Sequence, residues 1–426
     1  MYSDEVSARE YLPRLADDTL STLMAELPAV MVTGPRAAGK TTSARRLAGE
    51  VLRLDDPAVA AAVRADPDAA LRRSRGAVLV DEWQEVPSVL GAVKRAVDDD
   101  PSPGRFLLTG SVEADVSTTM WPSTGRVVRV VLHGLTQREV HRSTASRLLP
   151  ALVSGSLGTI VAPPAAPDVD SYVRTALASG FPEPALRLGP IARKAWLEGY
   201  LDQLVTRDVR AAGQVRDPVR LRRYLEVLGL STAGLPATAT LREAAGINQR
   251  TADAYDDLLE GLYLVERTPP WISNRVHRLT KRAKRYFLDP GLAAAAARID
   301  ADDVLGDGDL LGRTLDTFVA AQLRPEVALH PSARLHHLRT GSGEQEVDLL
   351  VDLGRGRVLG MEVKAGSAPT RSDAKHLVRL RDVLGDDFVR GVVFHTGPAP
   401  FELDDRIWAL PIWTLWADTA ESRTEP

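Results

Sequence analysis

The clearest hydrophobic pattern in the chain is a short apolar run that leads into a glycine-containing loop. Val30, Met31 and Val32 are consecutive apolar residues, which predicts a buried strand of a parallel sheet. The loop follows over residues 34–42, and residues 42–48 continue with a helical pattern. This order of strand, loop and helix predicts the first unit of an α/β domain.

The same alternation continues through the first third of the chain. Further strands are expected from largely apolar runs at residues 51–54, 77–80 and 106–108, and from the alternating segment at residues 127–131. Residues 57–74 are rich in alanine and predict a helical region, and a leucine stripe over residues 12–27 predicts a helix before the first strand. We therefore expect residues 1–145 to form an α/β domain around a parallel sheet.

The middle of the chain changes character. Residues 146–168 contain several prolines and small residues, which indicates a linker. From residue 169 to about 300 the pattern is mainly helical, with a turn at residues 180–184, GFPEP. Within it, residues 240–267 read as helix, glycine-containing turn, second helix and strand, which is typical of a winged helix.

The last part, residues 301–426, predicts another α/β domain. Leu311, Leu315, Phe318 and Leu323 recur at helical spacing. Strands are expected after this helix, near residues 334–338, 346–351, 358–364 and 388–396. The glycines at residues 354–356 predict a hairpin between the second and third of these strands.

Composition narrows the classes of function. The 426-residue chain has a net charge of −4, so any contact with nucleic acid must come from a local patch. It has no cysteine, which excludes disulfides and thiolate metal sites. The start lacks an apolar core for a signal peptide, and the uncharged residues 148–167 contain four prolines, so we expect a cytoplasmic protein without a membrane span.

The loop after the first strand carries the strongest chemical motif. It fits G-x-x-x-x-G-K-[ST], in which backbone N–H groups surround a phosphate and the helix N-terminus adds a positive dipole end. Lys40 is expected to reach the β/γ-phosphates, and the Thr41 hydroxyl to bind Mg²⁺. The predicted nucleotide-binding residues are Gly34, Pro35, Arg36, Ala37, Ala38, Gly39, Lys40, Thr41 and Thr42.

Residues at the ends of later strands predict the rest of this site. Asp81 and Glu82 follow the buried run at residues 77–80, so we expect Asp81 to hold Mg²⁺ and Glu82 to orient the attacking water. Thr109, at the tip of the next strand, is the expected sensor of the water or the γ-phosphate. Arg126 is either a guanidinium for the γ-phosphate, in its own or a neighbouring subunit of a homo-oligomer, or a surface arginine.

Four motifs in this order, VMVTGPRAAGKTT, VLVDEWQEVP, FLLTGS and STGR, carry a family resemblance. They resemble prokaryotic AAA-type P-loop ATPases, similar to the archaeal-type STAND/AAA branch, with a C-terminal restriction-endonuclease-like domain of unknown function. The resemblance implies ATP and Mg²⁺ as ligands, and a lid role for the helical region that contains GFPEP. It places the catalytic set on Glu82, Thr109 and Arg126.

The middle region offers two candidate surfaces for nucleic acid. Residues 248–251 begin the second helix of the winged-helix pattern, but that helix also carries acidic residues that repel phosphates, so DNA reading and protein interaction both remain open. Residues 275–285, RVHRLTKRAKR, contain six basic residues and are flanked by Trp271 and Tyr286. They predict a DNA or RNA contact, or alternatively a site for an acidic partner.

The C-terminal domain contains a second possible catalytic set. Residues two apart in a strand share a face, so Glu362 and Lys364 point the same way and a hairpin brings Asp348 across from them. Asp316 adds an acid from the preceding helix. These four residues resemble the PD-(D/E)-x-K nuclease core, in which two carboxylates hold Mg²⁺ and a lysine positions water.

The scarcity of lysine gives these assignments some weight. Only seven of the 53 basic residues are lysine, namely Lys40, Lys94, Lys194, Lys281, Lys284, Lys364 and Lys375. A lysine in so arginine-rich a chain suggests a need for a compact ammonium.

Two functions fit the sequence. The first is an Mg²⁺-dependent ATPase coupled to a nuclease-like or nucleic-acid-binding C-terminal domain, in a DNA-linked process such as mobile-element defence. The second is an ATP-dependent signalling or scaffold switch whose C-terminal domain recognises a partner without cleaving it.

Overall fold

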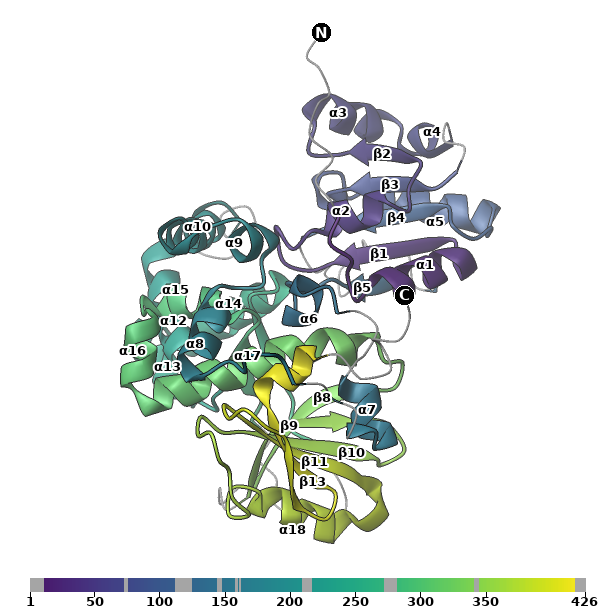
Figure 1. Ribbon diagram of the computed structural model, residues 1–426. Coiled ribbons are helices and arrows are strands. Elements are labelled where there is room, and N and C mark those ends of the chain that lie inside the picture. The colour runs from purple at the N-terminus through teal and green to yellow at the C-terminus, as the bar shows by residue number, and fades with distance from the viewer. Residues whose placement is uncertain are drawn as a thin grey trace.

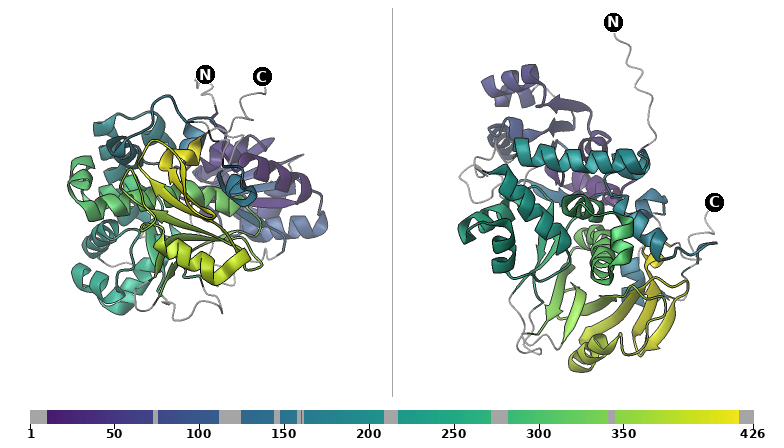
Figure 2. Two further views of the ribbon diagram at one scale, coloured as in Figure 1. Left: turned by 60° about the horizontal axis from the view of Figure 1, so that its bottom comes forward. Right: turned by 90° about the vertical axis from the view of Figure 1, so that its left-hand side faces the viewer.

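The computed structural model divides the chain into three parts (Figure 1). It describes residues 11–72, 76–111, 125–143, 148–157, 160, 162–208, 217–271, 282–340 and 345–417. The N-terminal domain and the C-terminal sheet lie at opposite ends of the molecule, and the helices of the middle region lie between them (Figure 2). The fold is therefore α/β at both ends with a helical centre.

A five-stranded sheet forms the N-terminal domain, with strand order β2-β3-β4-β1-β5 and parallel pairing throughout. The strands are β1 (Ala29–Thr33), β2 (Glu50–Arg53), β3 (Val78–Asp81), β4 (Phe106–Thr109) and β5 (Val128–Val131). The helices are α1 (Asp17–Glu26), α2 (Lys40–Arg45), α3 (Pro57–Ala65), α4 (Pro67–Arg72) and α5 (Val89–Asp99), with a 3₁₀ turn η1 (Trp83–Glu85). The expected parallel α/β architecture is confirmed.

Alternation along the strands divides the core of this domain in two. Met31, Val80 and Leu108 pack on one face of the sheet, whereas Val32 and Leu107 pack on the other. The edge strands β2 and β5 carry Glu50, Arg53 and Arg129, whereas the central strands, covered on both faces, are apolar almost throughout. That is the pattern from which they were predicted.

The segment expected to be a linker is partly helical. Two short helices, α6 (Gln137–Val140) and α7 (Leu148–Ser154), follow β5. Leu148, Leu149 and Leu152 of α7 are buried in the core of the C-terminal domain. The linker expected over residues 146–168 was therefore wrong for α7, because these leucines find an apolar surface that is remote in sequence.

The middle region is a set of helices with one small hairpin. Its helices are α8 (Val169–Leu177), α9 (Pro182–Leu186), α10 (Pro190–Gln203), α12 (Pro218–Leu230), α13 (Thr238–Ala245), α14 (Gln249–Gly261), α15 (Pro290–Ala297) and α16 (Ala301–Gly306), with a π-helical turn η3 (Leu204–Asp208). Gly246 ends α13 with a φ of 64°, and the Asn248 side chain caps α14. The strands β6 (Val265–Thr268) and β7 (Lys284–Phe287) pair antiparallel. This is the predicted order of helix, turn, helix and strand.

The C-terminal domain is a mixed six-stranded sheet between two helices. Its strand order is β12-β13-β11-β10-β9-β8. The elements are α17 (Gly308–Leu329), β8 (Arg334–Arg339), β9 (Glu346–Asp352), β10 (Val358–Val363), α18 (Lys375–Leu384), η4 (Gly385–Asp387), β11 (Phe388–His395), β12 (Phe401–Asp404), β13 (Ile407–Pro411) and η5 (Ile412–Trp416). Phe318 and Leu323 of α17 pack on one face, and Leu377 and Leu380 of α18 on the other.

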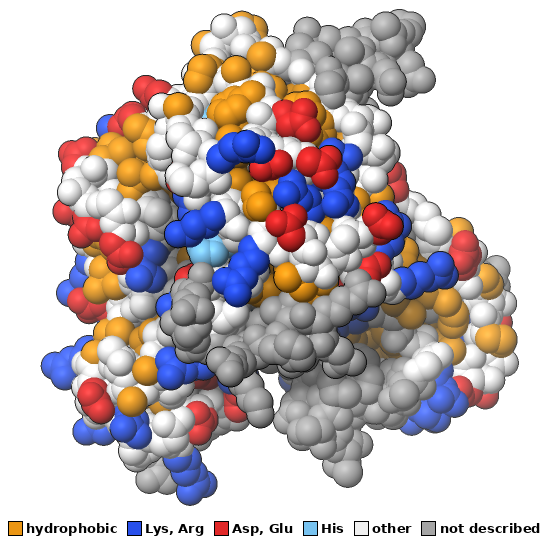
Figure 3. All heavy atoms as spheres, turned by 90° about the horizontal axis from the view of Figure 1, so that it is seen from below, with side chains coloured by type: hydrophobic (Ala, Val, Ile, Leu, Met, Phe, Trp, Pro, Cys, Tyr) orange, Lys and Arg blue, Asp and Glu red, His pale blue; other side chains and the backbone are white. Residues whose placement is uncertain are grey.

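The surface of the C-terminal end mixes charges of both signs (Figure 3). In this domain Arg371 and Arg381 both pair with Asp404, at 2.8 and 3.1 Å. In the described part of the chain, no helix combines the length and apolar character that crossing a bilayer requires.

Helix α17 joins the C-terminal domain to the N-terminal one through buried polar groups. The Arg138 guanidinium, on α6, lies 3.4 Å from the Glu326 carboxylate and donates to the Leu415 carbonyl at 2.9 Å. Gln322 accepts a hydrogen bond from the backbone N–H of Gln137 at 2.6 Å. Arg138 and Glu326 are 2% and 6% exposed, so this ion pair is shielded from solvent.

We expect Arg138→Ala to destabilise the protein by about 3 kcal/mol, because it removes the guanidinium from a buried ion pair with Glu326 and from its hydrogen bond to the Leu415 carbonyl. Urea unfolding followed by tryptophan fluorescence measures the change. Arg187→Ala is the control, because its ion pair with Glu183 is exposed and contributes less than about 1 kcal/mol. Equal urea midpoints for the two variants would contradict a stabilising role for the ion pair between Arg138 and Glu326.

Candidate functional site

The phosphate loop leaves the C-terminal end of β1 and enters α2, as predicted. Gly34 has a φ of 138° and Gly39 a φ of 95°, which side chains rarely adopt. A Cβ atom on Gly34 would collide with the backbone carbonyl of Leu132, in the segment after β5. Both glycines are therefore required by the path of the loop.

Lys40 lies inside the loop rather than on the surface. It is 5% exposed, and its ammonium donates to the carbonyl oxygens of Gly34 and Pro35 at 3.0 and 2.7 Å. Burial lowers the pKa of Lys40 to about 8, although the nearby Glu82 carboxylate favours its charged form. A cation held in this way is in position to meet a phosphate that enters the loop.

Asp81 is the point at which three elements meet. Its Oδ1 atom accepts hydrogen bonds from the Thr41 hydroxyl at 2.7 Å and from the Thr109 hydroxyl at 2.5 Å. This is possible because β4 lies between β1 and β3, so the ends of these strands share one edge of the sheet. The two predicted Mg²⁺ ligands, Thr41 and Asp81, are thus direct neighbours.

Glu82 adopts an unusual backbone conformation beside them. Its φ is 56°, and its N–H lies 3.4 Å from the Thr109 hydroxyl oxygen, to which it donates. Its carboxylate accepts a hydrogen bond from the Gln84 side chain. A strained, non-glycine residue at the end of a strand is common in catalytic sites.

Arg126 lies away from the residues around Asp81 in its own chain. It precedes β5 and pairs with Asp98 at 2.8 Å, whereas the phosphate loop follows the other end of the adjacent strand β1. The two positions are about 20 Å apart along the strand direction. A contact of Arg126 with its own γ-phosphate therefore does not fit this arrangement, and a contact with a neighbouring subunit stays a prediction.

The middle region covers the phosphate loop. The Tyr200 hydroxyl on α10 donates to the Arg36 carbonyl at 3.3 Å, and a Cβ on Gly39 would lie 3.9 Å from the Pro182 ring. From the other side, Arg14 donates to the carbonyls of Ala38 and His133 at 2.9 and 2.7 Å. The loop is thus held by residues far from it in sequence.

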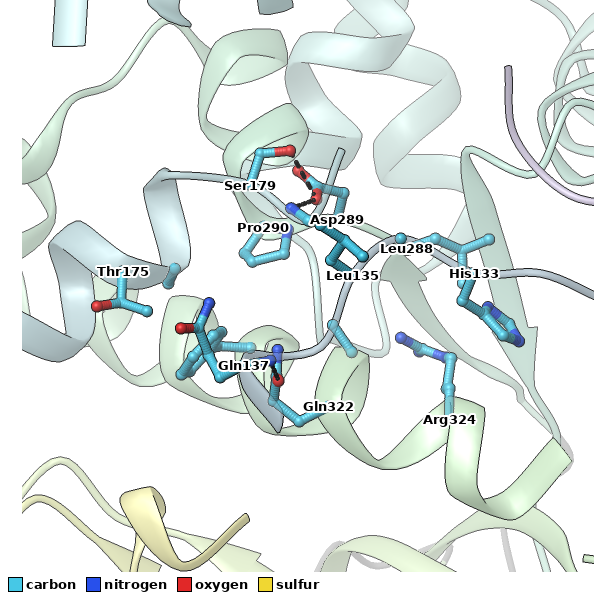
Figure 4. Close-up of a pocket in the computed structure, with 15 residues that line it drawn as sticks. His133, Leu135, Gln137, Thr175, Ser179, Leu288, Asp289, Pro290, Gln322 and Arg324 are labelled. Atoms are coloured by element: carbon cyan, nitrogen blue, oxygen red, sulfur yellow. Dashed lines mark hydrogen bonds between the residues drawn. The ribbon is translucent and has the colours of Figure 1, made fainter. Parts of the chain in front are cut away.

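The segment after β5 connects this site to α17 (Figure 4). His133 points toward Arg324 of α17, and burial lowers the pKa of His133 to about 4, so the ring is neutral. Nearby, the Asp289 carboxylate accepts from the Ser179 hydroxyl at 2.9 Å and from the Gly180 N–H at 2.6 Å. The GFPEP turn is thereby fixed beside the phosphate loop.

The four acidic and basic residues predicted in the C-terminal domain also come together. Lys364 donates to Glu362 at 3.0 Å, and Asp348 accepts from the Val363 N–H at 3.1 Å. Burial raises the pKa of Glu362 well above its ordinary value, and the nearby Asp348 carboxylate adds to the rise. Asp316, Asp348 and Lys364 line an open pocket of about 530 Å³.

Sequence reasoning missed the residue at the centre of this cluster, Lys284. Its ammonium lies 2.6 Å from Asp316 and 3.2 Å from Asp348. Burial raises the pKa of Asp316 to about 6 even though Lys284 favours its charged form. In Asp348 burial is opposed by the Lys284 ammonium, the Val363 N–H and the Lys364 ammonium, which together outweigh it and lower the pKa. The scarcity of lysine was a signal for Lys284, but only the fold pairs it with these acids.

The basic stretch over residues 275–285 needs correction at its end. Residues 275–281 lie outside the described residues. Lys284 and Arg285 are 2% and 9% exposed, and Arg285 pairs with Asp256 of α14 at 2.6 Å. The flanking Trp271 and Tyr286 are also buried. These four residues cannot contact a nucleic acid in this arrangement, because their charges and rings are used inside the protein.

The two sites differ in their fit to a divalent metal. At the phosphate loop, the Thr41 hydroxyl and the Asp81 carboxylate lie next to each other at one edge of the sheet. Two adjacent oxygen ligands suit Mg²⁺. In the C-terminal cluster, Lys284 already contacts two of the three carboxylates. Among the described residues, no group of three acidic or histidine side chains is arranged to hold a metal ion. Mg²⁺ does not fit the C-terminal cluster as it stands.

Two relatives match almost the whole chain. An uncharacterized protein of Mycobacterium bovis is 31% identical over 389 residues, which cover 90% of this chain and 80% of the relative. An uncharacterized protein of Mycobacterium tuberculosis matches with the same identity and coverage. The chain belongs to the family of these proteins.

Three known domain families account for consecutive parts of this family member. An AAA domain matches residues 26–141, a domain of unknown function (DUF8612) matches residues 169–303, and another (DUF4143) matches residues 311–415. The Walker-type ATPase of Pyrococcus abyssi is a distant structural neighbour, with a TM-score of 0.40, 14% identity, and coverage of 68% of this chain and 96% of that one. The P-loop site thus lies in an AAA domain.

We expect Gly34→Ala in the AAA domain to lower the affinity for ATP at least about tenfold, because the added Cβ collides with Leu132 and strains the loop. Fluorescence anisotropy of a labelled ATP analogue measures the affinity. Gly189→Ala is the control, since its Cβ would have no neighbour within 4 Å. Unchanged affinity in Gly34→Ala would show that the loop tolerates a side chain there.

Proposed function

We propose that the AAA domain binds ATP with Mg²⁺ and hydrolyses it. The observation that carries this proposal is the convergence of the Thr41 and Thr109 hydroxyls on Asp81 beneath the loop that buries Lys40. In this arrangement Lys40 would bind the β/γ-phosphates, and Thr41 and Asp81 would hold the Mg²⁺ ion. The ion would neutralise phosphate charge when bound.

Glu82 is our proposed residue for activating water. Its backbone N–H donates to the Thr109 hydroxyl, so the two residues lie next to each other at adjacent strand ends. Glu82 would orient the attacking water as a base, and Thr109 would donate a hydrogen bond to it or to the γ-phosphate. Gln84 holds the Glu82 carboxylate in place beforehand.

We propose that this ATPase cycle moves the helical middle region. Tyr200 donates a hydrogen bond to the phosphate loop, Pro182 faces Gly39 of the loop, and Tyr263 lines a small cavity together with Pro35 of the loop. A nucleotide that reshapes the loop must therefore change contacts with the middle region. This supports the lid role implied by the family resemblance.

The first test separates binding from hydrolysis. We expect Lys40→Ala to lose ATP binding, and Glu82→Gln to keep binding while phosphate release falls at least about 100-fold. Binding is measured by calorimetry and hydrolysis by release of phosphate. Glu85→Gln is the matched control, because Glu85 is an exposed glutamate in the adjacent turn. Normal turnover by Glu82→Gln would remove Glu82 from the mechanism.

The C-terminal domain has two candidate roles. The open pocket beside Asp348 and Lys364 supports a DNA-linked process, such as mobile-element defence, in which this domain binds or cleaves nucleic acid. The ion pairs of Lys284 support the second candidate, a switch whose C-terminal domain recognises a partner without cleaving it. Both candidates use the same ATPase.

We expect the protein to bind DNA or RNA at low salt in the presence of ATP and Mg²⁺. Any metal-dependent cleavage should disappear in Lys364→Ala and persist in Lys375→Ala, whose lysine is exposed on α18. Gel shift and cleavage of supercoiled, linear and single-stranded substrates measure the two effects. Phosphate release without binding or cleavage would leave the scaffold switch as the function.

A further inference from the structure

The Lys284 ammonium is surrounded by oxygen atoms from two other elements. It lies 2.6 Å from the Asp316 carboxylate on α17 and 3.2 Å from the Asp348 carboxylate on β9. It also donates to the backbone carbonyl of Asp348, at 3.3 Å. All three hydrogen-bond donors of the ammonium therefore have oxygen acceptors.

The surroundings of this ammonium are closed on the side of the middle region. Lys284 is 2% exposed, and the adjacent Tyr286 is fully buried with its hydroxyl 3.0 Å from the second oxygen of Asp316. The acids also face the open pocket that Asp316, Asp348 and Lys364 line. Solvent thus reaches the cluster from the side of the pocket, and β7 covers the opposite side.

The acceptor set around Lys284 is of the kind that divalent metals use. Mg²⁺ and Mn²⁺ prefer carboxylate and carbonyl oxygens, which are the groups that Lys284 contacts. One further carboxylate oxygen, Oε1 of Glu362, is buried without a hydrogen-bond donor among the described residues. Glu362 is 3% exposed and its other oxygen pairs with Lys364 at 3.0 Å. An acceptor left unpaired in this position indicates that the cluster can take more positive charge.

We propose that Lys284 is a built-in cation that occupies the place of a divalent metal between Asp316 and Asp348. The cluster then accepts a metal ion only when the ammonium leaves. In the described arrangement a metal at these carboxylates would lie against a buried positive charge, which is strongly unfavourable. Removal of Lys284 leaves three carboxylates beside the single ammonium of Lys364, and a divalent ion restores the balance.

This assignment gives β7 a specific role. Lys284 comes from the middle region, whereas Asp316 and Asp348 belong to the C-terminal domain, so the ion pair joins the two. Movement of the β6–β7 hairpin would withdraw the cation and expose the acids together. The inference does not rest on ATP hydrolysis or on nucleic-acid cleavage, and it is tested without either.

The proposal is tested by measuring how much Mn²⁺, with no other ligand present, binds to the full chain. Electron paramagnetic resonance of the free Mn²⁺ ion reports the bound amount. We expect Lys284→Met to bind one more Mn²⁺ than the wild type, with an affinity at least about tenfold higher than any site the wild type shows at this cluster. The added ion should be lost in Lys284→Met with Asp348→Asn. Lys194→Met, which removes an exposed lysine on α10, should bind Mn²⁺ as the wild type does.

Two results would overturn the proposal. One is a folded Lys284→Met protein that binds no more Mn²⁺ than the wild type. The other is a wild-type protein whose Mn²⁺ binding already depends on Asp348. If Lys284→Met does not fold, Lys284→Met with Asp316→Asn removes one charge of each sign, and a weaker gain of Mn²⁺ binding that still depends on Asp348 is expected.

Discussion

A charge buried in a protein must be matched by an opposite charge, and this requirement governs how the parts of the molecule meet on α17. The helix buries Asp316, Arg324 and Glu326 on different faces. Their partners come from elsewhere in the chain: Lys284 on β7, Glu266 on β6 at 3.0 Å, and Arg138 on α6. An unpaired buried charge costs several kcal/mol. These ion pairs therefore favour a single arrangement of the three parts of the chain.

The two candidate sites are each organised by an aspartate, buried in the first and half-buried in the second, but they are assembled differently. Asp81 accepts from Thr41 and Thr109, which lie at the ends of strands in a single sheet. Asp348 instead receives the ammonium of a residue from another region. Asp81 and its two hydroxyl donors all belong to the AAA domain, whereas the second site combines Lys284 of the middle region with carboxylates of the C-terminal domain.

The position of the middle region relates the two sites. It contacts the phosphate loop through Tyr200, and it supplies Lys284 to the C-terminal cluster. Tyr286 belongs to the same strand as Lys284 and packs its ring 4.8 Å from the Arg324 guanidinium, on the helix that also carries Asp316. The middle region thus touches both candidate sites.

The sequence by itself determined the features that depend on neighbours in the chain. The phosphate loop, the apolar strands, the acids at the end of β3 and the face shared by Glu362 and Lys364 follow from local spacing, because loop and strand geometry repeat over a few residues. Only the tertiary structure decided which remote charges meet. Lys284 looked like part of a basic surface, Arg126 like a possible phosphate ligand, and α7 like a linker. Their positions depend on burial and pairing across distant segments, which local patterns do not encode.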